Sequence, residues 1–429
     1  DELVAADDAA GRVTAAAVAA RNPSPHYRAS AMDGLTLRSA DTRGAGDAPV
    51  VLARWSNAAA EPPHGEPWCL PVDTGSALPD WADAVLRIED AALVDGGYRI
   101  QSPVPPGRDV RPEGEDIAAG TRVLAAGARI RPADVGALLS TGNADVPVRR
   151  RPRVAILATG SEVVDPAVTV AGPGQVLDST SRVLAAMVEA AGGSAHRLGI
   201  VGDDEEALLR AIEDAAARFD AVAVIAGSAG GRRDLTVTAL SRAGQVLAHG
   251  IDIAPGRPAA IARLRRAPGS PLRPFVPAIA FPGYPVASIV VAEQLLLPLL
   301  ARMLGRSADA PATVKARVLR AVPSRIGIEE FRRVVLLPGD DGGVRVAALL
   351  PGGAGSLSSV TGAHGWLRID AAAEGLDAGS QVDVELMVPL AEADAAFVVG
   401  GKPCAASVQL EYLLRRRDPR ARVVHLRLA

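Results

Sequence analysis

Two acidic residues in the middle of the chain follow apolar runs and could bind a divalent cation. Glu162 lies in the turn Thr-Gly-Ser-Glu, after the apolar run that begins at Arg153. Asp234 ends a glycine-rich loop that follows the run AVAVIA, residues 221–226. If these runs are parallel strands, both loops lie outside the carboxyl ends of one sheet. Mg²⁺ is held by one or two carboxylates together with substrate phosphates, so we predict Glu162 and Asp234 as its ligands.

The same loops carry groups that could bind an anion. Three glycines precede a predicted helix start, where backbone N–H groups favour phosphate. Two arginines follow these glycines, and a third arginine lies in the loop APGRP. Solvation of a surface loop would explain the paired arginines equally well, and this alternative remains open. The candidate anion-binding residues are Gly227, Gly230, Gly231, Arg232, Arg233 and Arg257.

The elements that would position these residues follow from hydrophobic periodicity. From Arg153 to Gly305, short apolar runs alternate with amphipathic stretches. Leu184, Met187 and Val188 recur at helical spacing, and a long apolar helix is predicted from Val286 to about Leu304. This alternation predicts a mostly parallel sheet with helices on both faces. Two further acids have structural explanations, since Asp203 is placed to cap one helix and Asp178 to open another.

The flanking regions show different patterns. A helix is predicted from Ala5 through Val18, before a proline-punctuated connection. Residues 45–120 form short β-like stretches rich in proline and glycine. After about Ala310, apolar and polar residues alternate between Gly/Pro turns, which predicts a small β-barrel-like domain.

Composition excludes several classes of protein. A chain of 429 residues is expected to form two to four domains. Its net charge of −3 argues against a nucleic-acid-binding surface. Cys69 and Cys404 form neither a disulfide framework nor a metal-ligand spacing, which fits a reducing cytoplasm. The six histidines are scattered, and we assign none of them a metal.

Membrane and nucleotide motifs are not found. The polar start resembles no signal peptide, and the most apolar run carries Glu293, Gln294 and Arg302, so we predict a buried helix and no membrane span. No GxGxxG follows a strand and no GxxxxGK[ST] is present, which argues against dinucleotide dehydrogenases and P-loop enzymes. We expect a soluble, cytoplasmic protein.

An ordered set of motifs is far more specific than any one of them. The chain contains SAMDG, DTGSALPDWADAVLRIED, RPEGEDIAAG, GALLSTGNADVPV, RPRVAILATGSEVV, GIVGDDEEAL, GSAGGRRD, APGRP and FPGYPVAS, in this order. Over roughly residues 1–390 it resembles the molybdenum-insertion enzymes of molybdenum-cofactor synthesis, MoeA and the E domain of gephyrin. The resemblance implies an elongated homodimer of four-domain subunits, with the active cleft at the dimer interface. It also implies hydrolysis of adenylylated molybdopterin with a divalent cation and transfer of molybdate to the pterin dithiolene.

The resemblance also implies roles for residues in distant segments. Thr74 would position an anion, although a turn-forming hydroxyl is the commoner explanation. The FPGYP motif would form the back wall of the site, and it equally fits a plain strand-to-helix turn. Basic residues Arg332 and Arg333 fall in the matching C-terminal motif, where a surface role is an equal alternative. The implied catalytic set is Asp33, Asp116, Glu162, Asp234 and Arg257; the implied substrate-binding set adds Thr74, Pro282, Pro285 and Ser356 to the glycine-loop residues.

The chain departs from the family pattern in its catalytic loops. The usual Gly-Gly-Val-Ser-Val-Gly is replaced by the sequence from Ala226 to Gly231, and Lys-Pro-Gly-Lys-Pro by Ala254 to Pro258. Tyr284 and Thr180 each stand in place of an asparagine. One lysine is lost and the other is Arg257, which presents a planar fork in place of a point charge. A charged hydrogen bond contributes roughly 1.5–3 kcal/mol, so loss of the one lysine would weaken catalysis by about one to two decades without necessarily abolishing it, and Arg232 and Arg233 could restore the charge.

The chain continues beyond the resemblance with a predicted strand, helix and strand. This extension resembles the start of the periplasmic-binding-protein-like domain sometimes fused to these enzymes. Its Gly400–Lys402 turn could bind an anion, although an ordinary turn explains it better. We predict these segments: residues 1–44 with 121–150 as domain I, a linking and dimerising domain that contains a helix; 45–120 as an inserted β-rich domain II; 151–306 as the central α/β molybdopterin-binding domain III; 311–390 as a β-barrel-like domain IV; and 391–429 as a βαβ extension.

The prediction is an α/β multidomain homodimer with a central doubly wound, mostly parallel sheet of the MogA/MoaB type, a β-rich insertion and a small C-terminal β-barrel. Its predicted function is molybdenum insertion into adenylylated molybdopterin with Mg²⁺, with a molybdoenzyme or another cofactor-synthesis protein as a further partner. The alternative is a catalytically weakened paralogue that binds pterin or oxyanion as a sensor or scaffold. The choice between molybdenum and tungsten stays open.

Overall fold

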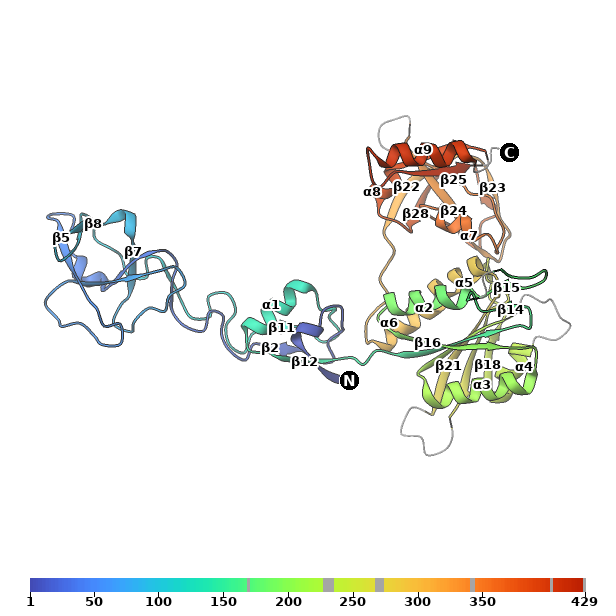
Figure 1. Cartoon of the computed structure of the whole chain (residues 1–429), viewed down its shortest axis with the longest axis horizontal. Coiled ribbons are helices and arrows are strands. Elements are labelled where there is room, and N and C mark those ends of the chain that lie inside the picture. The colour runs from blue at the N-terminus through green and yellow to red at the C-terminus, as the bar shows by residue number, and fades with distance from the viewer. Residues whose placement is uncertain (168–169, 227–234, 267–273, 340–343, 402–403, 427–429) are drawn as a thin grey trace. The chain divides into compact units, whose positions relative to one another are not determined.

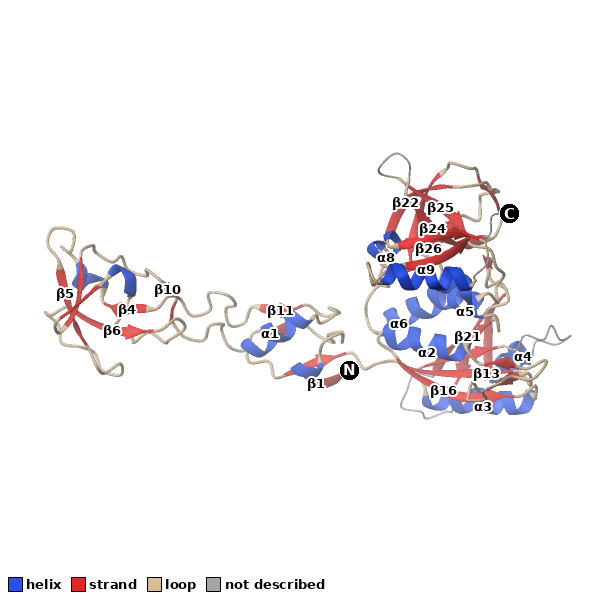
Figure 2. Cartoon of the chain, turned by 45° about the horizontal axis from the view of Figure 1, so that its top comes forward, coloured by secondary structure: helices blue, strands red, loops and turns tan. Residues whose placement is uncertain are grey.

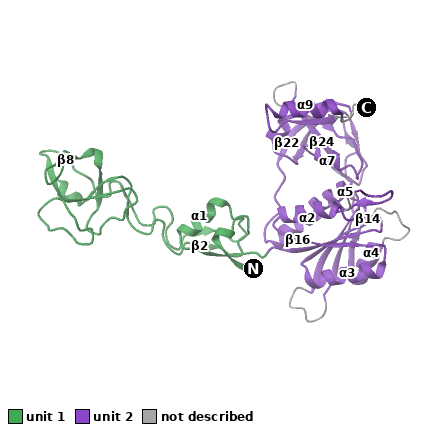
Figure 3. Cartoon of the chain, viewed as in Figure 1, with its two compact units in different colours: residues 1–150 green, residues 151–429 purple. Residues whose placement is uncertain are grey.

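The computed structural model describes residues 1–429 except 168–169, 227–234, 267–273, 340–343, 402–403 and 427–429. The chain separates into two compact units, Asp1–Arg150 and Arg151–Ala429 (Figure 3). Each unit is described by itself. The finer division into domains stays a prediction.

A six-stranded sheet forms one part of the first unit. Its strand order is β7-β4-β6-β5-β9-β8. Leu35, Leu37 and Leu52 are fully buried in its core beside Cys69, whose pKa burial raises to about 12. The strands are β4 (Gly34–Leu37), β5 (Val50–Arg54), β6 (Trp68–Val72), β7 (Ala84–Arg87), β8 (Ala92–Val94) and β9 (Gly97–Ile100), with the 3₁₀ turns η2 (Ser39–Thr42) and η3 (Ile88–Asp90).

Short antiparallel ladders build the rest of the first unit. They pair β1 with β12 and β2 with β11 around the helix α1, and β3 with β10 elsewhere in the unit. A separate apolar cluster, which includes Leu138 and Val146, fills this part. The elements are β1 (Glu2–Ala5), the 3₁₀ turn η1 (Ala6–Asp8), β2 (Val18–Ala19), β3 (Ala29–Ser30), β10 (Val110–Arg111), β11 (Arg122–Leu124), α1 (Pro132–Ser140) and β12 (Asp145–Val148).

The helix predicted from Ala5 through Val18 is wrong. Only a 3₁₀ turn follows β1, and Gly11 then takes a left-handed conformation with φ of 79°. The Thr14 N–H donates to the carbonyl of Ala128 at 3.0 Å. Distant strands therefore satisfy these backbone groups, and this tertiary pairing overrides the high helix propensity of an alanine-rich segment.

The second unit contains the central sheet, with strand order β16-β13-β17-β21-β20-β18. The first four strands are mutually parallel, whereas β20 runs antiparallel to β21 and β18 runs antiparallel to β20. The predicted mostly parallel sheet is confirmed. The strands are β13 (Arg153–Thr159), β16 (Ser194–Val201), β17 (Ala221–Ile225), β18 (Gly244–His249), β20 (Ala260–Arg265) and β21 (Phe275–Phe281).

Helices cover both faces of this sheet (Figure 1). Successive side chains of a strand point to opposite faces, so Val154 and Ile156 pack toward α2 and α5, whereas Ala155 and Leu157 pack toward α3 and α4. The predicted doubly wound arrangement is confirmed. The helices are α2 (Thr180–Ala190), α3 (Glu205–Arg218), α4 (Leu235–Ala243), α5 (Pro285–Val291) and α6 (Leu297–Met303), with the π-helical turn η4 (Ala292–Leu296) between the last two.

The long helix Pro285–Met303 is apolar enough to cross a membrane, with a mean hydropathy of 1.6. Its Val286, Val290 and Leu300 are nevertheless fully buried in the apolar cluster between the sheet and the helices α2, α5 and α6. The helix therefore belongs to the core of this unit, as predicted. Pro298 lacks an N–H and crowds the preceding turn, which accounts for the π-helical insertion just before it.

The C-terminal part of the second unit contains a closed barrel of five strands. The sheet order β24-β25-β22-β28-β26 closes because β24 also pairs with β26. The strand β19 (Ile253–Ala254) extends from the central region and pairs in parallel with β24. The predicted barrel is confirmed. Its elements are β22 (Thr313–Val318), β23 (Val322–Pro323), β24 (Glu329–Leu337), β25 (Arg345–Leu349), α7 (Leu357–Thr361), β26 (Gly365–Ile369), β27 (Gly375–Leu376) and β28 (Gln381–Leu386).

The segment after the barrel forms α8 (Leu390–Asp394), β29 (Ala396–Gly400), α9 (Ala405–Arg415) and β30 (Arg422–Leu426). Strands β29 and β30 pair in parallel, and α9 connects them. In Figure 2, α8 and α9 lie beside the barrel strands. Arg345 of the barrel makes a two-pronged ion pair with Asp394, at 2.6 and 2.8 Å, which fastens the extension to the barrel.

Candidate functional site

The parallel strands of the second unit end together at one edge of the sheet. Strands β16, β13, β17 and β21 end at Val201, Thr159, Ile225 and Phe281. The Gly160 N–H donates to the carbonyl of Val201 at 3.0 Å, and the Thr159 hydroxyl donates to the carbonyl of Ile225 at 3.0 Å. These bonds join three neighbouring strand ends into one platform, where ligands of such sheets bind.

Glu162 follows β13 at this edge and is half-buried. Gly160, with φ of 123°, makes room for its carboxylate, because a Cβ on Gly160 would lie only 2.6 Å from Glu162 Oε2. A glycine is therefore required for both the backbone conformation and the position of the acid. The structure thus places Glu162 at the strand end, with its carboxylate next to the Gly160 backbone.

The predicted cap by Asp203 is wrong. Asp204 caps α3 instead, because its carboxylate accepts the N–H of Ala207 at 2.8 Å. Asp203 accepts the N–H of Ser161 at 3.0 Å and returns its own N–H to the Ser161 hydroxyl at 3.1 Å. This reciprocal pair joins the loop after β16 to the loop that carries Glu162. Sequence spacing could not separate two adjacent aspartates before one helix.

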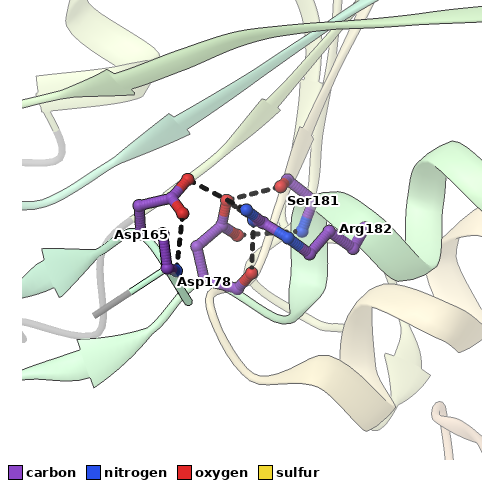
Figure 4. A network of polar contacts seen from close by, with 5 residues as sticks. Asp165, Asp178, Ser181 and Arg182 are labelled. Atoms are coloured by element: carbon purple, nitrogen blue, oxygen red, sulfur yellow. Dashed lines mark hydrogen bonds and ion pairs between the residues drawn. The ribbon is translucent and has the colours of Figure 1, made fainter. Parts of the chain in front are cut away.

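An arginine that the sequence analysis overlooked braces the same loop. Arg182, in the first turn of α2, contacts Asp178 Oδ2 at 3.0 Å and Asp165 Oδ2 at 2.9 Å (Figure 4). Asp178 accepts the Ser181 N–H at 3.0 Å, so it opens the helix as predicted. The pKa of Asp165 is lowered, first by the N–H of Ala167 and then by Arg182. A cation in the first turn of a helix is unfavourable unless carboxylates pair with it. The position of Arg182 was therefore the available signal that this arginine has carboxylate partners.

The loop APGRP lies at the same edge. Ala260, where β20 begins, pairs with Ala280 near the end of β21. Gly256 has φ of 138°, and a Cβ there would meet Ile253 at 2.9 Å. Only glycine therefore fits this turn, which leaves the adjacent Arg257 exposed to solvent.

The motif FPGYP forms a strand-to-helix turn at this edge. Pro282 is buried and its carbonyl accepts the Ser288 hydroxyl at 2.5 Å. Pro285 occupies the first turn of α5, where its missing N–H costs no hydrogen bond. Tyr284, at the N-cap position, is 53% exposed, and its ring lies so close to Gly355 that a Cβ there would be 3.2 Å from Tyr284 Cδ1.

The loop that carries Ser356 lies beside this turn. The Val286 N–H donates to the carbonyl of Ala354 at 3.0 Å. Arg333 supports the loop from inside, because it donates to the Ser359 hydroxyl at 3.1 Å and to the carbonyl of Gly352. Burial lowers the pKa of Arg333, which is 5% exposed, so the alternative of a surface role for this residue is wrong. The alternation of apolar and polar residues along β24 did not reveal that the side chain of Arg333 points inward.

The first unit holds its own group of predicted residues. Asp33 Oδ1 accepts both the N–H and the hydroxyl of Thr74 at 2.7 Å, and these bonds lower the pKa of Asp33. Arg87, opposite Gly34 in the adjoining strand, pairs with Asp109 at 3.1 Å. Asp109 has an unusual φ of 50°. The sequence analysis missed Arg87 and Asp109, although both lie in or beside motifs that it singled out.

Asp116 lies away from Asp33 within the first unit. Strand β3 runs antiparallel to β10, so the chain after β10 returns toward Ser24. The Asp116 N–H donates to the carbonyl of Ser24 at 3.1 Å, whereas Asp33 follows the other end of β3. Asp116 is exposed. The two predicted catalytic acids are thus not brought together within this unit.

Several predicted residues fall outside the described part of the chain. In the second unit the structure brings Glu162, Arg257, Pro282 and Pro285 to one edge, with the Ser356 loop beside them. Among the described residues, no three His, Cys, Asp or Glu side chains gather as a ready-made metal site. The residues outside the description are Gly227, Gly230, Gly231, Arg232, Arg233, Asp234 and Lys402.

Comparison with known proteins assigns the family. The chain matches the MoeA N-terminal region (domain I and II) over residues 1–142, the probable molybdopterin binding domain over 155–302 and the MoeA C-terminal region (domain IV) over 315–387. Molybdopterin molybdenumtransferase 2 of Mycobacterium tuberculosis is 30% identical over 381 residues, which cover 84% of this chain and 88% of that protein. The chain belongs to the MoeA family.

Other MoeA relatives agree with this assignment. Molybdopterin molybdenumtransferase 1 of Mycobacterium tuberculosis is 29% identical over 411 residues, covering 90% of this chain and 94% of that protein. The crystal structure of a molybdopterin biosynthesis MoeA protein from Pyrococcus horikoshii is 31% identical, covers 90% of this chain and 94% of its own, and superposes with a TM-score of 0.75. In this MoeA chain the strand-end edge falls inside the match to the probable molybdopterin binding domain.

Proposed function

We propose that this MoeA-family protein inserts molybdate into adenylylated molybdopterin during molybdenum-cofactor biosynthesis and hydrolyses the adenylate. Its relatives are named molybdopterin molybdenumtransferases. The observation that carries the proposal is the convergence of Glu162, Arg257 and the FPGYP turn at one strand-end edge, inside a match to a molybdopterin-binding family. An acid, a planar cation and an exposed tyrosine ring suit a substrate that combines phosphates with a flat pterin.

The proposed roles follow from the chemistry of each group. Arg257 binds substrate phosphate or molybdate oxygens through its planar guanidinium. The glycine loop and Arg232–Arg233 supply further donors in this proposal. Pro282 and Pro285 hold the turn that forms a wall for the substrate, and Ser356 donates from the adjacent loop. The arrangement fits substrate binding and orientation by preformed loops.

Mg²⁺ is the proposed cation, with Glu162 and Asp234 as its protein ligands. Glu162 fits this role, because its carboxylate is fixed against Gly160 at the strand ends. Mg²⁺ usually takes only one or two protein carboxylates and completes its shell with water and phosphate. When bound, it would neutralise the phosphate charge of the adenylate. In this proposal Glu162 holds the cation and Arg257 binds another part of the anionic substrate.

The proposal also includes a cytoplasmic homodimer. Asp33, Asp116 and Thr74 act as catalytic or binding residues of the first unit, and each site combines them with the strand-end edge of a second copy. Within the first unit, the Thr74 bonds already keep Asp33 ionised and oriented. The five-segment domain division and a molybdoenzyme or cofactor-synthesis partner are further parts of this proposal.

A second candidate function is a weakened paralogue that binds pterin or oxyanion without turnover. Ala254 stands where the family has lysine, and Tyr284 where it has asparagine. Both lie in the loops at the strand-end edge. Loss of the charged lysine donor would slow the reaction by about one to two decades, and loss of the neutral asparagine amide would add a smaller effect.

The test combines complementation of a strain that lacks the insertion enzyme with AMP release from adenylylated molybdopterin. The proposal expects AMP release that depends on molybdate and Mg²⁺, whereas tight pterin binding without AMP release supports the second candidate. Glu162→Gln should abolish AMP release, with Glu213→Gln on the exposed face of α3 as the matched control. Restoring lysine with Ala254→Lys should keep or raise the activity; a fall would show that the edge serves another reaction.

A further inference from the structure

Asp109 has an unusual backbone conformation for a residue with a side chain. Its φ is 50°, and no other non-glycine residue in the described part of the chain has a positive φ. Aspartate tolerates the left-handed region better than most residues, because its short polar side chain can bond locally. Such a conformation persists only where several contacts fix it together, and these places are often functional sites.

Asp109 contacts two other segments of the first unit. Its carbonyl accepts the Ala31 N–H at 2.9 Å. Its carboxylate accepts two hydrogen bonds from Arg87, from Nε at 3.1 Å to one oxygen and from Nη2 at 3.3 Å to the other. Only 17% of this carboxylate side chain is exposed to solvent. One residue therefore holds Ala31 through its backbone and Arg87 through its side chain.

The two contacts lie at opposite ends of the turn that carries Asp33. This turn, from Ala31 to Asp33, joins β3 to β4. Ala31 begins the turn, and Gly34, the first residue of β4, pairs directly with Arg87 on β7. Asp109 therefore spans the turn, because it binds the first residue and also binds the cross-strand partner of the residue that follows the last one.

The pairing of β4 with β7 makes this connection close. A Cβ on Gly34 would lie 2.1 Å from the carbonyl oxygen of Leu86, so the two strands are in tight contact. The Ile88 N–H donates to the carbonyl of Asp33 at 3.2 Å. Arg87 lies between Leu86 and Ile88 in the chain, so its ion pair is attached to the segment that fixes the backbone of Asp33.

The carboxylate of Asp33 is held through one oxygen. Thr74 donates both its N–H and its hydroxyl to Oδ1, each at 2.7 Å. No residue that the structure describes donates a hydrogen bond to Oδ2. The direction of Oδ2 is therefore set by the Thr74 bonds and by the backbone of the turn.

We propose that Asp109 is a positioning residue for Asp33, and that Arg87 is the partner that holds Asp109 in place. The inference rests on the proposed function, in which Asp33 is a catalytic residue. By fixing both ends of the turn, Asp109 keeps Oδ2 of Asp33 directed toward the substrate. A displacement of about 1 Å at a catalytic group can slow a reaction by about a hundredfold. The left-handed backbone lets one residue make both contacts.

The test measures AMP release from adenylylated molybdopterin by the full chain. Asp109→Asn keeps a residue that tolerates the left-handed backbone and removes the carboxylate charge. We expect kcat to fall by about three- to tenfold while KM changes little, because Asp109 orients a catalytic group and does not contact the substrate. Asp109→Gly also relieves the backbone strain, so it should keep the thermal midpoint of the natural protein and still lower kcat.

Variants of the arginine test the pair itself. Arg87→Gln should lower kcat as much as Asp109→Asn, and the double variant should lower it no further, because each change removes the same ion pair. Additive losses would contradict the pairing. Glu61→Gln is the matched control, since it removes an ion pair with Arg38, at 2.9 Å, elsewhere in the same unit, and it should leave kcat unchanged.

Hydrogen exchange tests the positioning without turnover. In Asp109→Asn, the amides from Ala31 to Gly34 should exchange faster by about threefold or more, and in Glu61→Gln they should not change. The proposal is overturned by a natural kcat in both Asp109 variants, by a rise in KM alone, or by unchanged exchange. If the natural protein releases no AMP, the proposed function fails, and the exchange comparison alone decides whether Asp109 positions the turn.

Discussion

Replacement of Glu293 by glutamine should stabilise the second unit above neutral pH. Glu293 lies in the π-helical turn η4, largely buried where this helix faces the barrel. Burial raises its pKa from 4.5 to about 7, and the charge of Glu385 on β28 adds to this. The indole N–H of Trp366 on β26 opposes the shift without forming a hydrogen bond of regular geometry. Glu385 is itself within 3.8 Å of Arg368.

The magnitude follows from linkage between protonation and folding. The folded state retains the proton of Glu293 between pH 4.5 and about 7, whereas the unfolded state releases it. Stability therefore falls as pH rises through this window. At about 1.36 kcal/mol for each pH unit, the ionised carboxyl costs at most about 3 kcal/mol above pH 7. Glutamine has the same shape and no charge, so it removes this cost.

The assay is denaturant unfolding followed by circular dichroism between pH 5 and 8. Glu293→Gln should differ from the natural protein by less than about 1 kcal/mol near pH 5 and exceed its stability by up to about 3 kcal/mol near pH 8. Glu213→Gln, on the solvent face of α3, should leave the pH dependence unchanged. Parallel pH profiles for the natural protein and Glu293→Gln, or a loss of stability at pH 8, would refute the assignment of the buried charge.

Three further substitutions test the loops. Gly160→Ala should destabilise by about 1–3 kcal/mol and reduce AMP release, because φ is 123° and the new Cβ would displace Glu162; denaturant unfolding and AMP release check both effects. Gly256→Ala, at φ of 138°, should cost a similar amount in denaturant unfolding. Asp33→Asn should leave the thermal midpoint nearly unchanged but lower AMP release by about tenfold, because the charged acceptor for Thr74 is lost; unchanged turnover would remove Asp33 from the catalytic set.

The α/β architecture could be derived from periodicity and turn chemistry alone. The continuous apolar run of β13, which is buried on both faces, and the helical spacing in α2 depend on neighbouring residues, and Pro285 signals a helix start by its missing N–H. Glu162 could also be placed at the edge of the sheet from the sequence, because the carboxyl ends of parallel strands lie at the same edge. These features are local or follow from a general rule of parallel sheets.

Only the tertiary structure decided the hydrogen bonds and ion pairs that join residues far apart in the sequence. Strands far along the chain take the backbone bonds of Thr14 and its neighbours, so no helix forms there. Barrel closure buries Arg333, Asp203 pairs with Ser161 in another loop, and Arg182 finds the carboxylate of Asp165. Sequence pattern therefore predicted the strands and helices of the central sheet and placed Glu162 at its edge. Long-range packing decided each charged side chain's partner, because the energy of a charge depends on groups that only the fold brings near.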